Sequence, residues 1–225
     1  MQVHVAFTPD EAATAQVGIV VDVLRATSTI AQALASGFRR VLCCGEIGEA
    51  RSLRAQLPDS LVGGERKAMR IEGFDVGASP REFLEARAET LILSTTNGTR
   101  AILETARRCE KVLLGSLLNL AAVARAARDD DAVIVCAGFQ GAFALDDAYC
   151  AGRIVQLLER SRSDAAIAAE LLVRAFPTAL EALNARTYGP PGLEEDIAFC
   201  ARENVLDVVP RLVGMVGPAA EIMVA

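Results

Sequence analysis

The chain has 225 residues, of which 52% are hydrophobic, a length and composition that predict one globular domain with an ample core and exclude a disordered chain. Its 23 basic and 29 acidic residues give a formal net charge of −6, which argues against a nucleic-acid partner, because such surfaces carry an excess of positive charge. The longest charge-free stretch, residues 132–145, is shorter than the roughly 18 apolar residues of a membrane-spanning helix, so we expect no membrane partner.

Short runs rich in β-branched and apolar residues predict strands. Several are almost wholly apolar, as expected for strands that are covered on both faces. The runs lie at residues 3–7, 17–23, 39–43, 60–63, 90–95, 111–115 and 132–137. Helical spacings of apolar residues lie between them, at 30–34, 47–57, 120–127 and 150–158. This alternation predicts an α/β protein, a three-layer α/β/α fold with a mainly parallel sheet.

The character of the chain changes near residue 146, so the single domain expected over residues 1–225 can have two lobes. Helical patterns dominate to about residue 185, and a rigid turn is expected at Tyr188-Gly-Pro-Pro-Gly-Leu193. A short helix near 194–202 and a closing strand at 221–224 complete the helical C-terminal part. Residues 65–79 and 186–193 are predicted to be irregular loops, long enough to carry a function, and Ser79-Pro-Arg-Glu82 fits a helix-capping box.

Ligands of open α/β sheets gather outside the carboxyl ends of the strands, and the segment after residues 17–23 is the first such end. Asp22 follows an apolar run, where a carboxylate needs a partner or a cation, and it can hold a metal or act as a base. Arg25 can grip a phosphate or carboxylate with two hydrogen bonds. Thr27 or Ser28 is either the N-cap of the next helix or part of the site.

A second strand end carries small polar residues, Thr95, Thr96, Asn97, Gly98 and Thr99. At a helix N-terminus such residues expose backbone N–H groups beside the positive end of the helix dipole, which suits an anion. The alternative is an ordinary capped turn, but the segment has more such residues than capping requires.

Two acidic pairs precede or begin predicted helices. Asp146 and Asp147 can bind Mg²⁺ through oxygen, although acidic residues also favour a first helical turn, and adjacent side chains point in different directions. Glu194 and Asp196 allow the same two interpretations, a metal or catalytic role or simple dipole complementarity.

The segment after residues 60–63 combines charges with glycine. Glu65, Arg66, Lys67 and Arg70 are there, and glycines next to them let the backbone approach a ligand closely. The plain alternative is a solvated loop.

Several chemistries are excluded by what the chain lacks. It has one histidine, His4, which reads as a strand residue, so a Ser-His-Asp triad is not expected. It has no phosphate-binding GxxxxGK[ST] loop and no GxGxxG, and its six scattered cysteines include no CxxC, so nucleotide and zinc sites are not expected. The cysteines should be reduced core residues of a cytoplasmic protein, since the N-terminus resembles no signal peptide. What remains is Mg²⁺-assisted handling of a small phosphorylated or multiply anionic metabolite.

Motifs spread over nearly the whole chain resemble the 2-phosphosulfolactate phosphatase family, and they occur in the family's order. They are Val21-Asp-Val-Leu-Arg-Ala-Thr-Ser-Thr29, Gly64-Glu-Arg66, Gly73-Phe-Asp-Val-Gly-Ala-Ser-Pro80, Thr95-Thr-Asn-Gly-Thr99, Cys136-Ala-Gly138 and Leu193-Glu-Glu-Asp-Ile-Ala-Phe-Cys200. The resemblance implies a Mg²⁺-dependent phosphatase with a layered α/β fold. It also implies release of phosphate from 2-phospho-3-sulfolactate, giving sulfolactate on the route to coenzyme M.

We therefore expect one crevice that holds a small anionic phosphorylated substrate. Asp22, Arg25 and Asp147 are the predicted catalytic residues, and Arg66, Lys67 and residues 95–99 are predicted to bind substrate. Mg²⁺ is expected on some of Asp22, Glu65 and Asp147, with Thr27, Ser28, Asp146, Glu194 and Asp196 in reserve. Attack is expected from a metal-activated water, with Asp22 as covalent nucleophile the alternative.

Other functions stay open at this point. A non-catalytic sensor of small anions would need the arginines and loops without the Mg²⁺ carboxylates. A phosphatase for another phosphorylated hydroxy acid, or a Mg²⁺-dependent lyase or isomerase, would use the same residues. A homodimer is the default assembly, because closed two-fold assemblies are the commonest.

Overall fold

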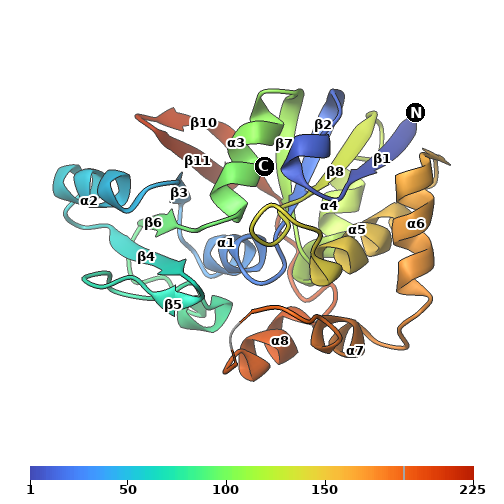
Figure 1. Ribbon diagram of the computed structural model, residues 1–225. Coiled ribbons are helices and arrows are strands. Elements are labelled where there is room, and N and C mark those ends of the chain that lie inside the picture. Colours follow the sequence, from blue (N-terminus) through green and yellow to red (C-terminus); the bar gives the residue numbers. More distant parts are fainter. Residues whose placement is uncertain (190) are drawn as a thin grey trace.

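The computed structural model describes residues 1–189 and 191–225, and its strands form one 11-stranded sheet (Figure 1). The strand order is β5-β4-β6-β3-β11-β10-β7-β2-β8-β1-β9. The strands are β1 (Gln2–Ala6), β2 (Ala15–Val21), β3 (Arg40–Cys44), β4 (Leu61–Arg66), β5 (Met69–Arg70), β6 (Thr90–Ser94), β7 (Cys109–Gly115), β8 (Ala132–Cys136), β9 (Ser161–Arg162), β10 (Pro210–Val216) and β11 (Ala219–Val224).

Two parallel groups of strands make up most of the sheet. In one, β6 pairs in parallel with β4 and β3; in the other, parallel pairs join β7, β2, β8, β1 and β9. The antiparallel hairpin β10–β11 lies between them, with β11 on β3 and β10 on β7. The hairpin therefore joins the two parallel groups of strands into one mixed sheet through antiparallel pairings. The predicted layered α/β fold is confirmed, and the closing strand lies in the middle of the sheet, within a hairpin.

The helices are α1 (Ala26–Ala35), α2 (Ile47–Gln56), α3 (Gly98–Ala106), α4 (Leu120–Ala126), α5 (Leu145–Leu157), α6 (Asp164–Val173), α7 (Ala179–Asn184) and α8 (Glu194–Cys200), with short 3₁₀ turns η1 (Pro9–Glu11), η2 (Pro80–Phe83) and η3 (Leu117–Asn119). The four predicted apolar stripes lie in α1, α2, α4 and α5, and the chain forms further helices beside them. The predicted capping box begins η2, where Ser79 Oγ accepts from Arg81 N–H and Glu82 from Ser79 N–H.

Of the two loops predicted to be irregular, one contains regular structure and the other does not in its described residues. Residues 65–79 are not wholly irregular, because Glu65 and Arg66 end β4 and a two-residue turn leads directly into β5. The described residues of 186–193 do form a loop without regular structure, whereas the expected rigid turn includes Pro190, which lies outside the described residues.

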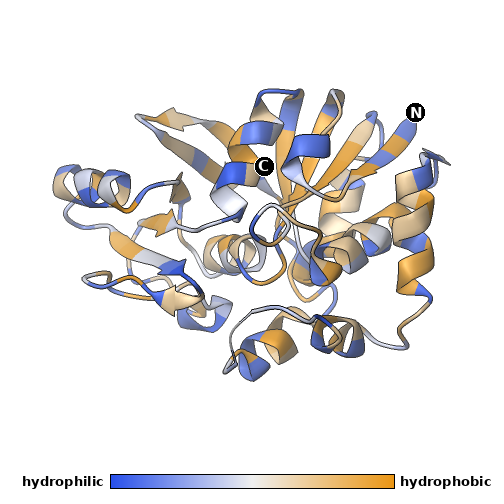
Figure 2. Cartoon of the chain, in the orientation of Figure 1, coloured by the Kyte–Doolittle hydropathy of each residue, from blue (hydrophilic) through white to orange (hydrophobic). Residues whose placement is uncertain are grey.

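The core lies on both faces of the sheet. Along β2, Ile19 and Val21 pack with α4, α5 and α6, whereas Val20 packs on the other face with α1 and α3. Figure 2 shows the apolar residues concentrated in the neighbouring strands β2, β7 and β8. No helix of the described residues is long and apolar enough to cross a membrane.

The six cysteines are free thiols in the structure. Five are buried, and Cys109 is half-buried. Burial raises the pKa of the Cys44 thiol to about 12, so it stays protonated at neutral pH. The expectation that the cysteines pack in or beside the core is met by their burial.

Candidate active site

A pocket of about 570 Å³ lies where strands from both parallel groups end. Residues at or just after the carboxyl ends of β2, β4, β6 and β8 line it, together with the loop that precedes α8. Leaving the reserve residues aside, the pocket brings together most of the predicted site residues, namely Asp22, Arg25, Glu65, Arg66, Lys67, Thr95, Thr96 and Asn97. Segments that lie far apart in the sequence therefore meet in one crevice.

Asp22 is a nearly buried carboxylate, 8% exposed, at the end of β2. Its Oδ1 accepts a hydrogen bond from Ala26 N–H at 3.1 Å, which ties it to the first turn of α1. No described residue donates a hydrogen bond to Oδ2. Burial raises the pKa of Asp22 from 3.8 to about 7, and the nearby Asp146 and Glu65 carboxylates add to the rise. A negative charge on Asp22 is therefore costly unless a cation joins it.

The Thr95–Thr99 segment leads from β6 into α3, as the sequence predicts. Thr95 Oγ1 accepts from Thr99 N–H at 3.3 Å and lies 3.1 Å from Thr99 Oγ1, so these two residues cap the helix within the segment. Asn97 is the N-cap residue, but its side chain forms no capping hydrogen bond and lines the pocket instead. Gly98 is required at its position, because a Cβ there would lie 2.4 Å from Ala26 Cβ and 2.8 Å from Asp22 Oδ2.

Glu65 links this segment to the turn between β4 and β5. Its Oε1 accepts from Thr96 N–H at 2.9 Å and from Thr96 Oγ1 at 2.8 Å, and its Oε2 accepts from Ala68 N–H at 2.8 Å. Both oxygens are thus already engaged. Glu65 holds two walls of the pocket together.

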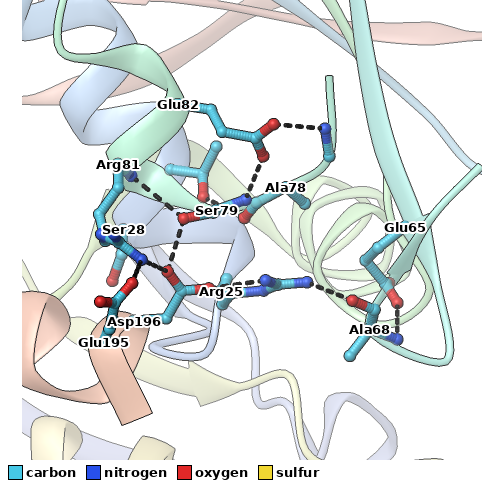
Figure 3. A network of polar contacts seen from close by, with 12 residues as sticks. Arg25, Ser28, Glu65, Ala68, Ala78, Ser79, Arg81, Glu82, Glu195 and Asp196 are labelled. Carbon is cyan, nitrogen blue, oxygen red and sulfur yellow. Dashed lines mark hydrogen bonds and ion pairs between the residues drawn. The ribbon is translucent and has the colours of Figure 1, made fainter. Parts of the chain in front are cut away.

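Arg25 bridges two other walls (Figure 3). Its Nη1 donates to Asp196 Oδ2 at 2.7 Å, and its Nη2 donates to the carbonyl oxygen of Ala68 at 2.9 Å. The Asp196 carboxylate also accepts from Ser79 Oγ at 2.5 Å and lies 3.8 Å from Arg81 Nη1. Asp196 does not line the pocket; it holds a side chain that does.

Three cations line the pocket without an acidic partner among the described residues. Arg66 donates to the Gly45 carbonyl at 2.7 Å and to Ser94 Oγ at 3.1 Å, and Lys67 is exposed on the turn. Arg186 reaches the pocket from the loop that precedes α8. Among the residues that the structure describes, none of the three has an acidic oxygen within 4.0 Å, so their charges are available to an anionic ligand.

Asp147 lies behind the pocket, 3% exposed, in the first turn of α5. Its Oδ1 accepts from Val23 N–H at 2.8 Å and its Oδ2 from Gly138 N–H at 3.0 Å. It therefore fastens the loop after β2 to the loop after β8. Burial, with Asp146 and Asp22 nearby, raises the pKa of Asp147 well above 3.8.

Its neighbour Asp146 is also buried, and it accepts a very short hydrogen bond from the Tyr188 hydroxyl. Burial raises the pKa of Asp146, and the Tyr188 hydrogen bond opposes that rise. The contact holds the loop before α8 against the pocket, where Tyr188 stacks on Phe139 with ring centroids 4.7 Å apart.

The remaining reserve residues have structural contacts. Thr27 and Ser28 lie inside the first turn of α1, where Arg25 is the N-cap residue, so neither is the predicted N-cap. Thr27 Oγ1 donates to the Asp22 carbonyl at 2.9 Å and Ser28 Oγ to the Val23 carbonyl at 2.8 Å. Glu194 is exposed at the start of α8 and does not line the pocket.

Residue-by-residue reading of the sequence missed four lining residues with aromatic or polar side chains, Phe139, Gln140, Arg186 and Tyr188. Two signals pointed to their segments: the Cys136-Ala-Gly138 motif, which ends just before Phe139, and the irregular loop expected at 186–193. Neither signal singled out a residue, because these side chains reach the pocket only through tertiary contacts.

The donor set fits Mg²⁺ in chemistry. Asp22 offers a carboxylate oxygen to which no described residue donates, in a pocket that Glu65 also lines, and the Asp146 carboxyl lies near it outside the lining. The described residues contain no group of three or more His, Cys, Asp and Glu side chains arranged to hold a metal ion. Mg²⁺ usually binds one or two protein carboxylates and completes its shell with water and substrate phosphate, so Asp22 Oδ2 matches in kind the protein's part of such a site.

The fold and the pocket together define an α/β protein built to hold a small, strongly anionic ligand. Unpaired cations, helix-terminal polar groups and one buried carboxylate meet in a single crevice at the strand ends.

Comparisons with known proteins identify the family. A family model described as 2-phosphosulpholactate phosphatase matches residues 4–214. A protein of Pseudothermotoga lettingae is 39% identical over 218 residues, covering 94% of this chain and 96% of its own length. One of Thermus thermophilus is 38% identical over 233 residues, covering 97% and 98%. Both are named probable 2-phosphosulfolactate phosphatase. The chain belongs to the 2-phosphosulfolactate phosphatase family and is a phosphoric monoester hydrolase, as its motifs indicate.

Proposed function

We propose that this chain hydrolyses 2-phospho-3-sulfolactate to 3-sulfolactate and inorganic phosphate, with Mg²⁺ as cofactor, on the route to coenzyme M. The observation that carries the chemistry is the pocket itself, where Arg66, Lys67 and Arg186 lie beside the buried Asp22 and have no acidic partner in the part of the chain that the structure describes. The name shared by the relatives supports the choice of substrate.

The charge of the substrate matches the cations of the pocket. The proposed substrate carries a phosphate, a carboxylate and a sulfonate, and a protein with a net charge of −6 must concentrate positive charge locally to bind it. Arg66 and Lys67 approach from the β4–β5 side and Arg186 from the loop before α8. Anionic groups at both ends of one small molecule can therefore be bound at once.

The segment that begins α3 is placed to hold the phosphoryl group. Thr95, Thr96 and Asn97 line the pocket at the positive end of the helix dipole, where donors stabilise charge on phosphate oxygens. In the reaction, the bond between phosphorus and the ester oxygen breaks, a water oxygen bonds to phosphorus, and the leaving oxygen gains a proton. Because charge spreads over the phosphoryl oxygens in the transition state, fixed donors there accelerate the reaction.

Among the three predicted metal ligands, Asp22 is the one whose oxygen is free to bind Mg²⁺. Glu65 and Asp147 use both carboxylate oxygens as hydrogen-bond acceptors, and Asp147 lies outside the pocket lining. When bound, Mg²⁺ supplies charge neutralisation at the phosphoryl oxygens. Since the pKa of Asp22 is about 7 without a cation, a proton and Mg²⁺ compete for it. We expect Mg²⁺ affinity to fall as the pH drops below 7.

Phosphate release tests this proposal. The purified protein is incubated with 2-phospho-3-sulfolactate, 2-phospholactate and 3-phosphoglycerate, and free phosphate is measured with malachite green, with EDTA and after Mg²⁺ is restored. We expect the highest kcat/KM on 2-phospho-3-sulfolactate, loss of activity in EDTA and recovery with Mg²⁺. A higher kcat/KM on another ester would contradict the proposed substrate. Binding without turnover would favour an anion sensor, and turnover without free phosphate would favour a lyase or isomerase.

A further inference from the structure

Asp196 on α8 is a buried carboxylate outside the pocket that reaches it through another side chain. Its side chain is 6% exposed and accepts from Ser79 Oγ at 2.5 Å and from Arg25 Nη1 at 2.7 Å. Figure 3 shows these donors converging on the one carboxylate. Asp196 thereby fixes the Arg25 guanidinium, whose own side chain is 9% exposed.

Arg25 carries the connection across the pocket. Its second nitrogen, Nη2, donates to the Ala68 carbonyl at 2.9 Å, so one planar guanidinium spans from α8 to the turn between β4 and β5. The planar group with several fixed donors suits such a bridge, which a lysine could not make.

The turn that Arg25 holds is strained. It comprises only Lys67 and Ala68, with φ of 53° and 61°, both in the left-handed region. A two-residue hairpin turn of this kind prefers Asn-Gly, and non-glycine residues persist in it only where their surroundings hold them. Ala68 is held on both sides, because its carbonyl accepts from Arg25 and its N–H donates to Glu65 Oε2.

We propose that Asp196 is a positioning residue, which acts through Arg25 and the Lys67–Ala68 turn to aim the Lys67 ammonium into the pocket. This inference rests on the proposed function of the pocket. The turn presents one functional side chain, Lys67, which lines the pocket and forms no ion pair with the described residues. The same turn is joined through Glu65 to Thr96, so a relay runs around the pocket rim from α8 to the start of α3.

Binding of inorganic phosphate, measured by isothermal titration calorimetry with Mg²⁺ present, tests the relay without requiring turnover. We expect Asp196→Asn to weaken phosphate binding about tenfold, the size of one charge-assisted hydrogen bond. Glu195→Gln is the matched control: its carboxylate is next in the helix, 75% exposed, and pairs with Arg81 at 2.5 Å without touching Arg25. We expect a change of less than about twofold for this control.

Two double variants separate positioning from a general structural role. In a Lys67→Ala background, Asp196→Asn should weaken phosphate binding by less than about twofold, because the side chain that the relay positions is gone. Adding Ala68→Gly to Asp196→Asn should restore most of the affinity, since glycine adopts the left-handed turn without help. The proposal would be overturned if Asp196→Asn weakened phosphate binding equally in the wild type and in Lys67→Ala, or if adding Ala68→Gly restored no affinity. If Asp196→Asn does not fold, Arg25→Lys replaces it in the same cycle, because lysine keeps the charge but cannot bridge to Ala68.

The two proposals fail in different ways. A wild-type protein that binds phosphate but hydrolyses no ester contradicts the proposed function, and the cycle still tests the relay. If the protein hydrolyses 2-phospho-3-sulfolactate, but Asp196→Asn weakens phosphate binding equally in the wild type and in Lys67→Ala, only the relay is overturned. Absence of phosphate binding by the wild type overturns both.

Discussion

Replacing Asp22 by asparagine should stabilise the metal-free protein and inactivate it at the same time. The pKa of Asp22 is raised from 3.8 to about 7, so the folded state favours the protonated form. Stability from this group is fully present below pH 3.8 and is lost as the pH rises through about 7. Because each tenfold change in acid dissociation is worth about 1.4 kcal/mol, the loss approaches about 4 kcal/mol above pH 7.

Asparagine cannot ionise, and its Oδ1 can still accept from Ala26 N–H, so Asp22→Asn removes this penalty. At pH 8 in EDTA, we expect its urea-unfolding free energy to exceed the wild-type value by up to about 4 kcal/mol, and its Tm to rise by roughly 10 °C. At pH 4 the difference should vanish. Phosphate release should fall by about 10²–10³-fold, because a charge contact in the transition state is lost.

The matched control is Asp59→Asn, which removes the same charge from an exposed position and should leave stability nearly unchanged. An Asp22→Asn protein no more stable than the wild type at pH 8, with the same dependence of stability on pH, would refute the reasoning. Full activity in Asp22→Asn would refute the assignment of Asp22 to the chemistry.

Three further predictions follow from the contacts of the pocket. Asp147→Ala should lower the unfolding free energy by about 1–3 kcal/mol in urea titrations at pH 4, where ionisation of the carboxyl contributes little, because the N–H groups of Val23 and Gly138 lose their acceptor; an unchanged midpoint would contradict the fastening role. Arg186→Ala should raise KM about tenfold in steady-state assays with little change in kcat, since it removes an unpaired cation, and an unchanged KM would exclude that contact. Gly98→Ala should cost about 1–3 kcal/mol and abolish phosphate binding in calorimetry, because its Cβ would lie 2.4 Å from Ala26 Cβ; normal binding would show that α3 can shift.

The sheet was largely predictable because its strands are covered on both faces. The apolar runs at 17–23 and 132–137 correspond to β2 and β8, whose residues are mostly buried. The hairpin strand β10 escaped prediction for a physical reason. It begins with a proline, contains Gly214 and then alternates between exposed and half-buried positions, so it forms no continuous apolar run.

The site was predictable where residues directly follow strands. Asp22 and Thr95 come at strand ends, and the ends of the strands fix where they lie. Arg186 and Tyr188 follow a helix instead, and the Tyr188 contacts with Asp146 and Phe139 join segments that no local pattern connects. The two backbone donors of Asp147 are likewise invisible in the sequence, since any residue types could supply them.

A crystal structure with Mg²⁺ and inorganic phosphate bound would test the central claim most directly. We predict one phosphate within hydrogen-bond distance of Lys67 and Asn97, and Mg²⁺ on the Asp22 carboxylate with a phosphate oxygen in its shell. Phosphate bound elsewhere on the molecule, or Mg²⁺ bound away from Asp22, would contradict the account.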